Sequence, residues 1–175
     1  MPRLHQFAAA ICSTLVIGGG SACDIGAPAR VVTPADSTAG EAPFRLAGPG
    51  GAMLLVSVYI NGEGPYDLVL DTGATLTCVD QRVASELALP RAAAAVGYGA
   101  GVGGSGAVSL VRVDSLRLGE ARAERMTACV LDLQHLQALH GIGSAGSSVH
   151  GLLGLNFLRN FRVSLDFERN VVSLH

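Results

Sequence analysis

One aspartate in this sequence lies where a carboxylate could serve as a catalytic acid or base. Asp71 directly follows the apolar run Leu68–Leu70 and precedes Thr72 and Gly73. A glycine permits a tight reversal of the chain and the close approach of a partner, and a threonine hydroxyl can stabilise a turn by hydrogen bonds to the backbone. The pattern predicts a carboxylate held on a rigid loop at the end of a buried strand, a placement that favours catalysis.

Short strands are the elements that must position this loop. Apolar and β-branched runs predict strands over 52–60, 66–70, 75–79, 107–118 and 122–131, with a closing hairpin over 161–175. Asn61-Gly62 predicts a turn, extended by Gly64-Pro65. Asp80 is expected to cap a helix over 81–89, and 133–140 predicts a second short helix. We interpret the glycine-rich segment 97–106 as a loop, and 151–161 as an apolar strand followed by a short helix. These elements predict an all-β fold class, mainly β with one or two short helices, in a small closed domain.

Four segments in this order resemble a retropepsin-like aspartic protease domain over residues 52–175. They are GPYDLVLDTGAT, the glycine-rich 97–106, GLLGLNFL and VSLDFERNVVSL. More narrowly, the chain is similar to single-domain bacterial aspartyl proteases of the exported or membrane-tethered type. The resemblance implies a closed retropepsin-like acid-protease β-barrel over residues 44–175.

The resemblance also implies roles for individual residues. Asp71 is the catalytic aspartate, and its loop is shaped by Thr72, Gly73 and Ala74. A strand that contains Leu152, Leu153 and Gly154 lies beside that loop. A flap that covers the substrate is formed by Gly97, Tyr98, Gly99, Gly101, Gly103 and Gly104.

This chemistry requires two aspartates, because one carboxylate activates a water while its protonated partner polarises the peptide carbonyl. The sequence contains no second Asp-Thr-Gly or Asp-Ser-Gly. A symmetric homodimer would bring two copies of Asp71 together. The prediction is therefore an aspartic endopeptidase that acts on peptides or proteins and needs neither metal nor cofactor. The alternative is a catalytically inactive protein of the same fold that binds peptides or envelope partners.

The N-terminus predicts export. Arg3 precedes the apolar stretch 7–17, and small residues then lead to Cys23. This arrangement is typical of a signal peptide over residues 1–22, and it resembles a lipoprotein signal in which Cys23 is acylated. Plain export with cleavage after Ala22 is the alternative. The proline- and alanine-rich segment 23–43 is interpreted as a flexible linker. Together, the signal and the linker predict a domain in the bacterial cell envelope that faces the periplasm and is anchored by lipid.

Two cysteines remain in the domain. Cys78 and Cys129 are interpreted either as a disulfide of an exported protein or as two buried thiols. The spacing of His135, His140 and His150 places no pair on one helix face, so no metal site is expected.

Charge and composition exclude several other classes of function. The net charge of −2 gives no reason to expect nucleic acid as a partner. All twelve basic residues are arginine, which excludes lysine Schiff-base chemistry and a Walker-type phosphate loop.

Overall fold

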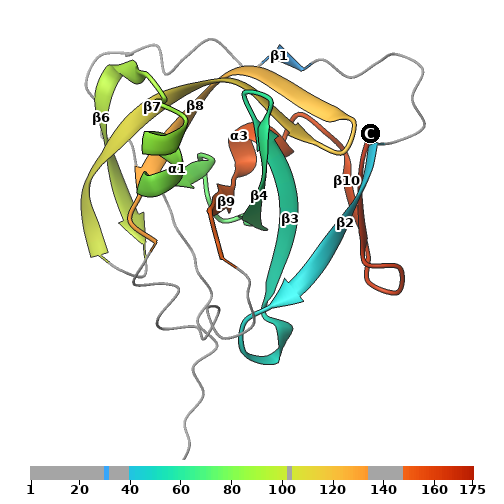
Figure 1. Cartoon of the computed structure of the whole chain (residues 1–175). Coiled ribbons are helices and arrows are strands. Elements are labelled where there is room, and N and C mark those ends of the chain that lie inside the picture. The colour runs from blue at the N-terminus through green and yellow to red at the C-terminus, as the bar shows by residue number, and fades with distance from the viewer. Residues whose placement is uncertain (1–29, 32–39, 102–103, 134–147) are drawn as a thin grey trace, which may run out of the picture.

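A computed structural model describes residues 30–31, 40–101, 104–133 and 148–175 of the 175-residue chain (Figure 1). The described strands are β1 (Arg30–Val31), β2 (Gly40–Ala47), β3 (Met53–Ile60), β4 (Glu63–Leu70), β5 (Cys78–Asp80), β6 (Arg91–Gly101), β7 (Gly104–Leu118), β8 (Ala121–Leu131), β9 (Gly151–Leu153), β10 (Val163–Asp166) and β11 (Val171–Leu174). The described helices are the 3-10 turn η1 (Pro49–Gly51), α1 (Gln81–Glu86) and α3 (Leu155–Leu158). None of the helices in these ranges is long and apolar enough to cross a membrane.

The strands close into a barrel. Their order is β10-β11-β2-β3-β4-β9-β5-β8-β7-β6, and β3 pairs with β7 as well. This additional pairing closes a ring of β3, β4, β9, β5, β8 and β7. Figure 1 shows β7 and β8 as long curved strands that run together across the top of the molecule. The predicted mainly β, closed domain with short helices is confirmed.

Strand β9 and the end of β4, at Leu68 and Val69, bury both of their faces. They pair in parallel, with Val69 opposite Leu152 and Leu70 opposite Leu153. Leu68 and Leu153 belong to one buried cluster, whereas Val69 and Leu152 belong to the other. A strand covered on both faces has a continuous apolar sequence instead of an alternating one, which explains the uninterrupted run before Asp71.

Two local predictions are confirmed beside these strands. Asn61 and Gly62 both have positive φ, at 53° and 89°, and they connect the paired strands β3 and β4. Asp80 caps α1 by accepting a hydrogen bond from the Arg82 backbone N–H. The predicted break at Gly64-Pro65 is wrong, because β4 already begins at Glu63 and passes through both residues.

The sequence interpretation also missed the extent of several strands. The strand expected over 75–79 is limited to β5, because 71–77 forms a loop. Strand β2 begins at Gly40 and β1 pairs with β8, so parts of the segment interpreted as a linker are paired with the sheet. The helix expected over 133–140 falls almost entirely outside the described residues.

The described residues of the glycine-rich segment, 97–101 and 104–106, lie in paired strands instead of an irregular loop. Strands β6 and β7 pair there as a hairpin, with Gly97 opposite Val108, Gly99 opposite Gly106 and Gly101 opposite Gly104. The composition was misleading because backbone pairing needs no side chains, so glycine does not prevent it.

Candidate active site

The loop that carries Asp71 leaves the end of β4 and is held by hydrogen bonds at its start. The Asp71 N–H donates to the Leu153 carbonyl on β9 over 3.0 Å, and the Ala74 N–H donates to the Asp71 carbonyl over 3.3 Å. The Gly73 N–H donates to Oδ1 of the Asp71 side chain over 2.8 Å. The carboxylate is therefore oriented by its own loop. Gly73 contributes this N–H donor, and its φ is not in the left-handed region.

The second carboxylate oxygen of Asp71 lacks a partner. Oδ2 is buried and has no hydrogen-bond partner among the described residues. Burial of an uncompensated carboxylate oxygen is costly. The site therefore has an acceptor ready for a donor that the described part of the chain does not supply.

Glycines allow β9 to lie directly against the loop that carries Asp71. A Cβ on Gly154 would overlap with the Leu76 carbonyl oxygen, and a Cβ on Gly151 would overlap with the Cys78 carbonyl oxygen. Leu152, Leu153 and Gly154, expected beside this loop, lie in or directly after β9, which pairs with β4, and Gly154 lies against Leu76. Thr72 is exposed on the same loop, whereas Ala74 is buried.

We expect Gly154→Ala to destabilise the fold by about 3 kcal/mol, because the added Cβ would displace the Leu76 backbone from its place beside β9. Urea unfolding of the variant and the wild type measures the loss. Gly50→Ala is the control, since a Cβ there meets nothing within 4 Å and only its left-handed φ of 66° resists substitution. That control should lose about 1 kcal/mol, and an equal loss in both variants would contradict the role of close packing at Gly154.

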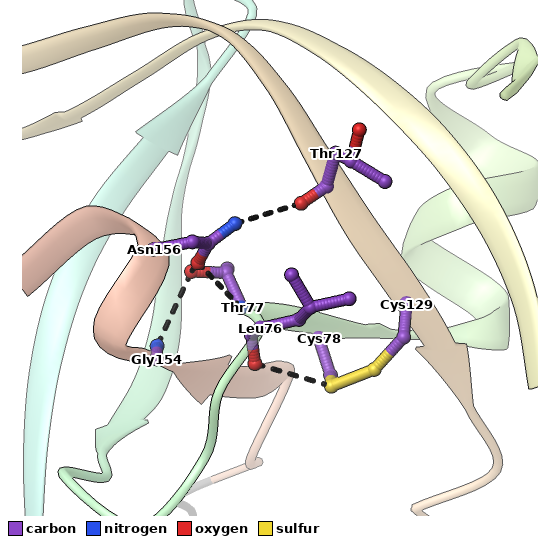
Figure 2. Close-up of a disulfide and its surroundings, with 7 residues drawn as sticks. All are labelled: Leu76, Thr77, Cys78, Thr127, Cys129, Gly154 and Asn156. Carbon is purple, nitrogen blue, oxygen red and sulfur yellow. Dashed lines mark hydrogen bonds between the residues drawn. A yellow bond between two sulfur atoms is a disulfide. The ribbon is translucent and has the colours of Figure 1, made fainter. Parts of the chain in front are cut away.

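A disulfide and a network of hydrogen bonds hold the far end of the loop (Figure 2). The structure joins Cys78 of β5 to Cys129 of β8, and both residues are buried. One residue earlier, Thr77 bonds to the side chain of Asn156 at the start of α3. The Asn156 amide also reaches the Thr127 carbonyl on β8. Figure 2 shows this amide between the loop and β8, a short way from the disulfide.

Sequence reasoning missed Thr77 and Asn156. The signal was available, because Asn156 is a single amide inside the apolar run Gly151–Leu158. A polar side chain within such a run is expected to bond to buried backbone groups. The identity of those backbone groups depends on how two segments 79 residues apart approach each other. The sequence alone does not predict that approach.

Asp80 fixes the other end of β5. The carboxylate is 1% exposed and accepts hydrogen bonds from the Arg82 backbone N–H and Nε and from the Leu133 N–H. Burial raises the pKa of Asp80, but the hydrogen bonds from Arg82 and Leu133 outweigh burial and hold it below its ordinary value. The ionised carboxylate of Asp80, at the end of β5, thus bonds both to the start of α1 and to Leu133.

We expect Asp80→Asn to lower the free energy of unfolding by about 2 kcal/mol at pH 7, because an amide cannot accept all of these hydrogen bonds. Since the folded pKa lies below the unfolded one, the contribution is present above about pH 4 and is lost as the pH falls through the folded pKa. Urea unfolding across this pH range tests the prediction. A difference between wild type and variant that stays constant down to pH 2 would contradict it.

The flap residues are only partly described. Backbone pairing places Gly97, Tyr98, Gly99, Gly101 and Gly104 in the β6–β7 hairpin, with Tyr98 opposite Ala107. Gly103 and the expected acylation site Cys23 lie outside the described residues. The hairpin is continuous with the barrel through β7, which pairs with both β3 and β8.

Metal-binding side chains do not gather in the described part of the chain, where no group of three His, Cys, Asp or Glu residues could hold an ion. His150 has a structural partner instead: its Nδ1 accepts a hydrogen bond from the Asp67 N–H over 3.0 Å. Its ring also packs edge-on against Tyr66. His135 and His140 lie outside the described residues.

Comparison with known proteins identifies the family. A retropepsin-like aspartic protease from Rickettsia conorii is similar in structure, with a TM-score of 0.49 and 14% identity over 83% of this chain and 93% of that one. The retroviral protease-like domain of Ddi1 from Leishmania major gives a TM-score of 0.42 and 16% identity over 70% and 91%. No curated protein sequence matches. Residues 56–157, more than half of the chain, match the family described as aspartyl protease. This stretch includes Asp71, its loop and β9, and the chain belongs to the aspartyl protease family.

Proposed function

We propose that this protein is an aspartic endopeptidase whose active site is completed by a homodimer, with one Asp71 from each subunit. The observation that carries the proposal is the carboxylate of Asp71. One of its oxygens is held by the Gly73 N–H, while the other is buried and has no donor among the described residues.

A second copy of the same loop would supply that donor. Two like charges about 3 Å apart cannot both be ionised, so a pair of carboxylates shares one proton. The protonated carboxyl can donate to Oδ2 of its neighbour. The sequence offers no second Asp-Thr-Gly or Asp-Ser-Gly within one chain, which favours a two-fold arrangement of identical subunits.

The reaction follows from this pair. The ionised carboxylate takes a proton from a water held between the two side chains, and the water attacks the carbonyl carbon of the peptide bond. The protonated carboxyl polarises the carbonyl oxygen. The carboxyl that took the proton from water then passes it to the nitrogen of the leaving amine as the C–N bond breaks. In this proposal the β6–β7 hairpin covers the substrate as a flap.

We also propose that the protein is exported and anchored by a lipid at Cys23. The disulfide between Cys78 and Cys129 supports export, because structural disulfides persist mainly in oxidising compartments. The basis for the lipid anchor is the sequence pattern around Cys23.

A sizing experiment combined with a peptide-library digest tests the proposed activity. We expect the purified protein to behave as a dimer and to cleave peptides in a pepstatin-sensitive manner. A stable monomer that cleaves no peptide would contradict the proposal and favour a protein that binds peptides without cutting them.

A further inference from the structure

We propose that Asn156 is a positioning residue for Asp71, because its carboxamide fixes the end of the catalytic loop opposite to the aspartate. The inference rests on the proposed function, since it concerns how the same site is held in its active geometry. The Asn156 side chain bonds to Thr77 and Thr127 and not to the Asp71 carboxylate among the described residues, so it acts through the loop 71–77.

The amide uses both of its ends. Oδ1 accepts two hydrogen bonds from Thr77, one from the backbone N–H over 2.7 Å and one from Oγ1 over 2.9 Å. Nδ2 donates to the Thr127 carbonyl on β8 over 2.8 Å. One side chain therefore links the loop, the start of α3 and the wall of the barrel, as Figure 2 shows.

Backbone bonds hold the rest of the loop to the same segment. Leu153 accepts from the Asp71 N–H, while the Leu155 N–H donates to Ala74 over 2.7 Å and the Asn156 N–H donates to Thr75 over 3.1 Å. The segment 153–156 thus follows the loop residue by residue. Asn156 is the residue of this segment whose own side chain also bonds to the loop, at Thr77.

Few side chains can replace this amide. Thr77 is fully buried, so its N–H has no access to water and needs a protein acceptor. Thr127 presents a carbonyl and therefore needs a donor. Asparagine supplies both at this length, whereas an ionised carboxylate supplies acceptors only and an apolar side chain supplies neither.

Loss of the amide would remove the two hydrogen bonds that Thr77 donates to Asn156. Thr77 would keep the bonds that its Oγ1 accepts from the Gly154 N–H and its carbonyl accepts from the Cys129 N–H, so the expected effect is a small shift of the loop. A small displacement of a catalytic group lowers the rate of chemistry more than it weakens substrate binding, because the transition state requires the narrower geometry. We therefore expect Asn156→Ala to lower kcat by about 10- to 100-fold and to leave KM within about 3-fold.

The experiment compares Asn156→Ala, Asn156→Asp and Asn160→Ala in the full chain. Asn160 is the matched control, because its amide lies in the turn that follows α3 and, within the described part of the chain, donates to the backbone carbonyls of Asn156 and Phe157. Thermal unfolding of each protein sets an assay temperature at which all of them are folded. Asn160→Ala should keep the kcat and KM of the wild type.

Asn156→Asp provides a readout that a purely structural role would not give. A protonated carboxyl can donate to the Thr127 carbonyl as the amide does, but an ionised one cannot. The ratio of its kcat to that of the wild type should rise by about 10-fold as the pH falls from about 7 to about 4. Asn156→Ala should show no such recovery.

Three results would overturn the inference. They are wild-type kcat in Asn156→Ala, a loss confined to KM, and a pH-independent kcat ratio for Asn156→Asp. If both variants fail to fold, Asn156 is a residue of the folding core and the positioning role is also rejected. A wild-type protein that does not cleave would instead reject the proposed function, so the two failures are distinguishable.

Discussion

Asp71→Asn should abolish peptide cleavage, with a loss of kcat on the order of 10⁴-fold, and should leave the fold intact. An amide at this position can still accept the Gly73 N–H through Oδ1, so the loop keeps its internal bond. It cannot take a proton from water, and this removes a contribution that a positioned acid or base makes to the rate. Steady-state cleavage of a peptide selected from the library measures the loss.

The fold of the Asp71→Asn variant is checked by its unfolding curve and its size in solution. Within one subunit Oδ2 of Asp71 accepts no hydrogen bond from the described residues, so the substitution removes no bond that stabilises the folded subunit. Unchanged cleavage by a clean preparation of the folded variant would remove Asp71 from the catalytic machinery.

Removal of the disulfide should cost about 4 kcal/mol of the free energy of unfolding. Cys78 and Cys129 have a sequence separation of 51, so the cross-link restricts a long loop of the unfolded chain. Without it the unfolded chain has a higher conformational entropy and is therefore favoured. The double variant Cys78→Ala and Cys129→Ala is preferred to serine, because both positions belong to a buried apolar cluster. Guanidinium unfolding of the variant and the wild type gives the difference.

Reductant provides the control for this prediction. Reduced wild type should approach the stability of the double variant, and the double variant should not respond to reductant, because its described domain contains no further cysteine. A difference of less than about 1 kcal/mol between the oxidised wild type and the double variant would contradict a stabilising disulfide.

Local chemistry explains the parts of the fold that could be predicted from the sequence. The apolar run before Asp71, the Asn61-Gly62 turn and the Asp80 cap each depend on residues that are close together in the chain. These patterns suffice to place the acid at the end of a buried strand.

The missed features depend on partners that are distant in the chain. Strand β2 contains Pro43 and alternates buried and exposed residues, and it is defined by its pairing with β11 and β3. The glycines of 97–106 do not reveal the β6–β7 pairing because their contribution is backbone alone. The contact between Thr77 and Asn156 likewise depends on β9 lying between β4 and β5, which brings two distant segments of the chain together.

Subunit mixing tests the central claim most directly, namely that two copies of Asp71 form one active site. Wild type is refolded together with nine parts of Asp71→Asn, and an unrelated inert protein in the same excess serves as the control. Random pairing leaves about one tenth of the wild-type subunits with a wild-type partner, so activity per wild-type subunit should fall to about a tenth. Activity per wild-type subunit that is unchanged by the excess of the variant would contradict a shared site.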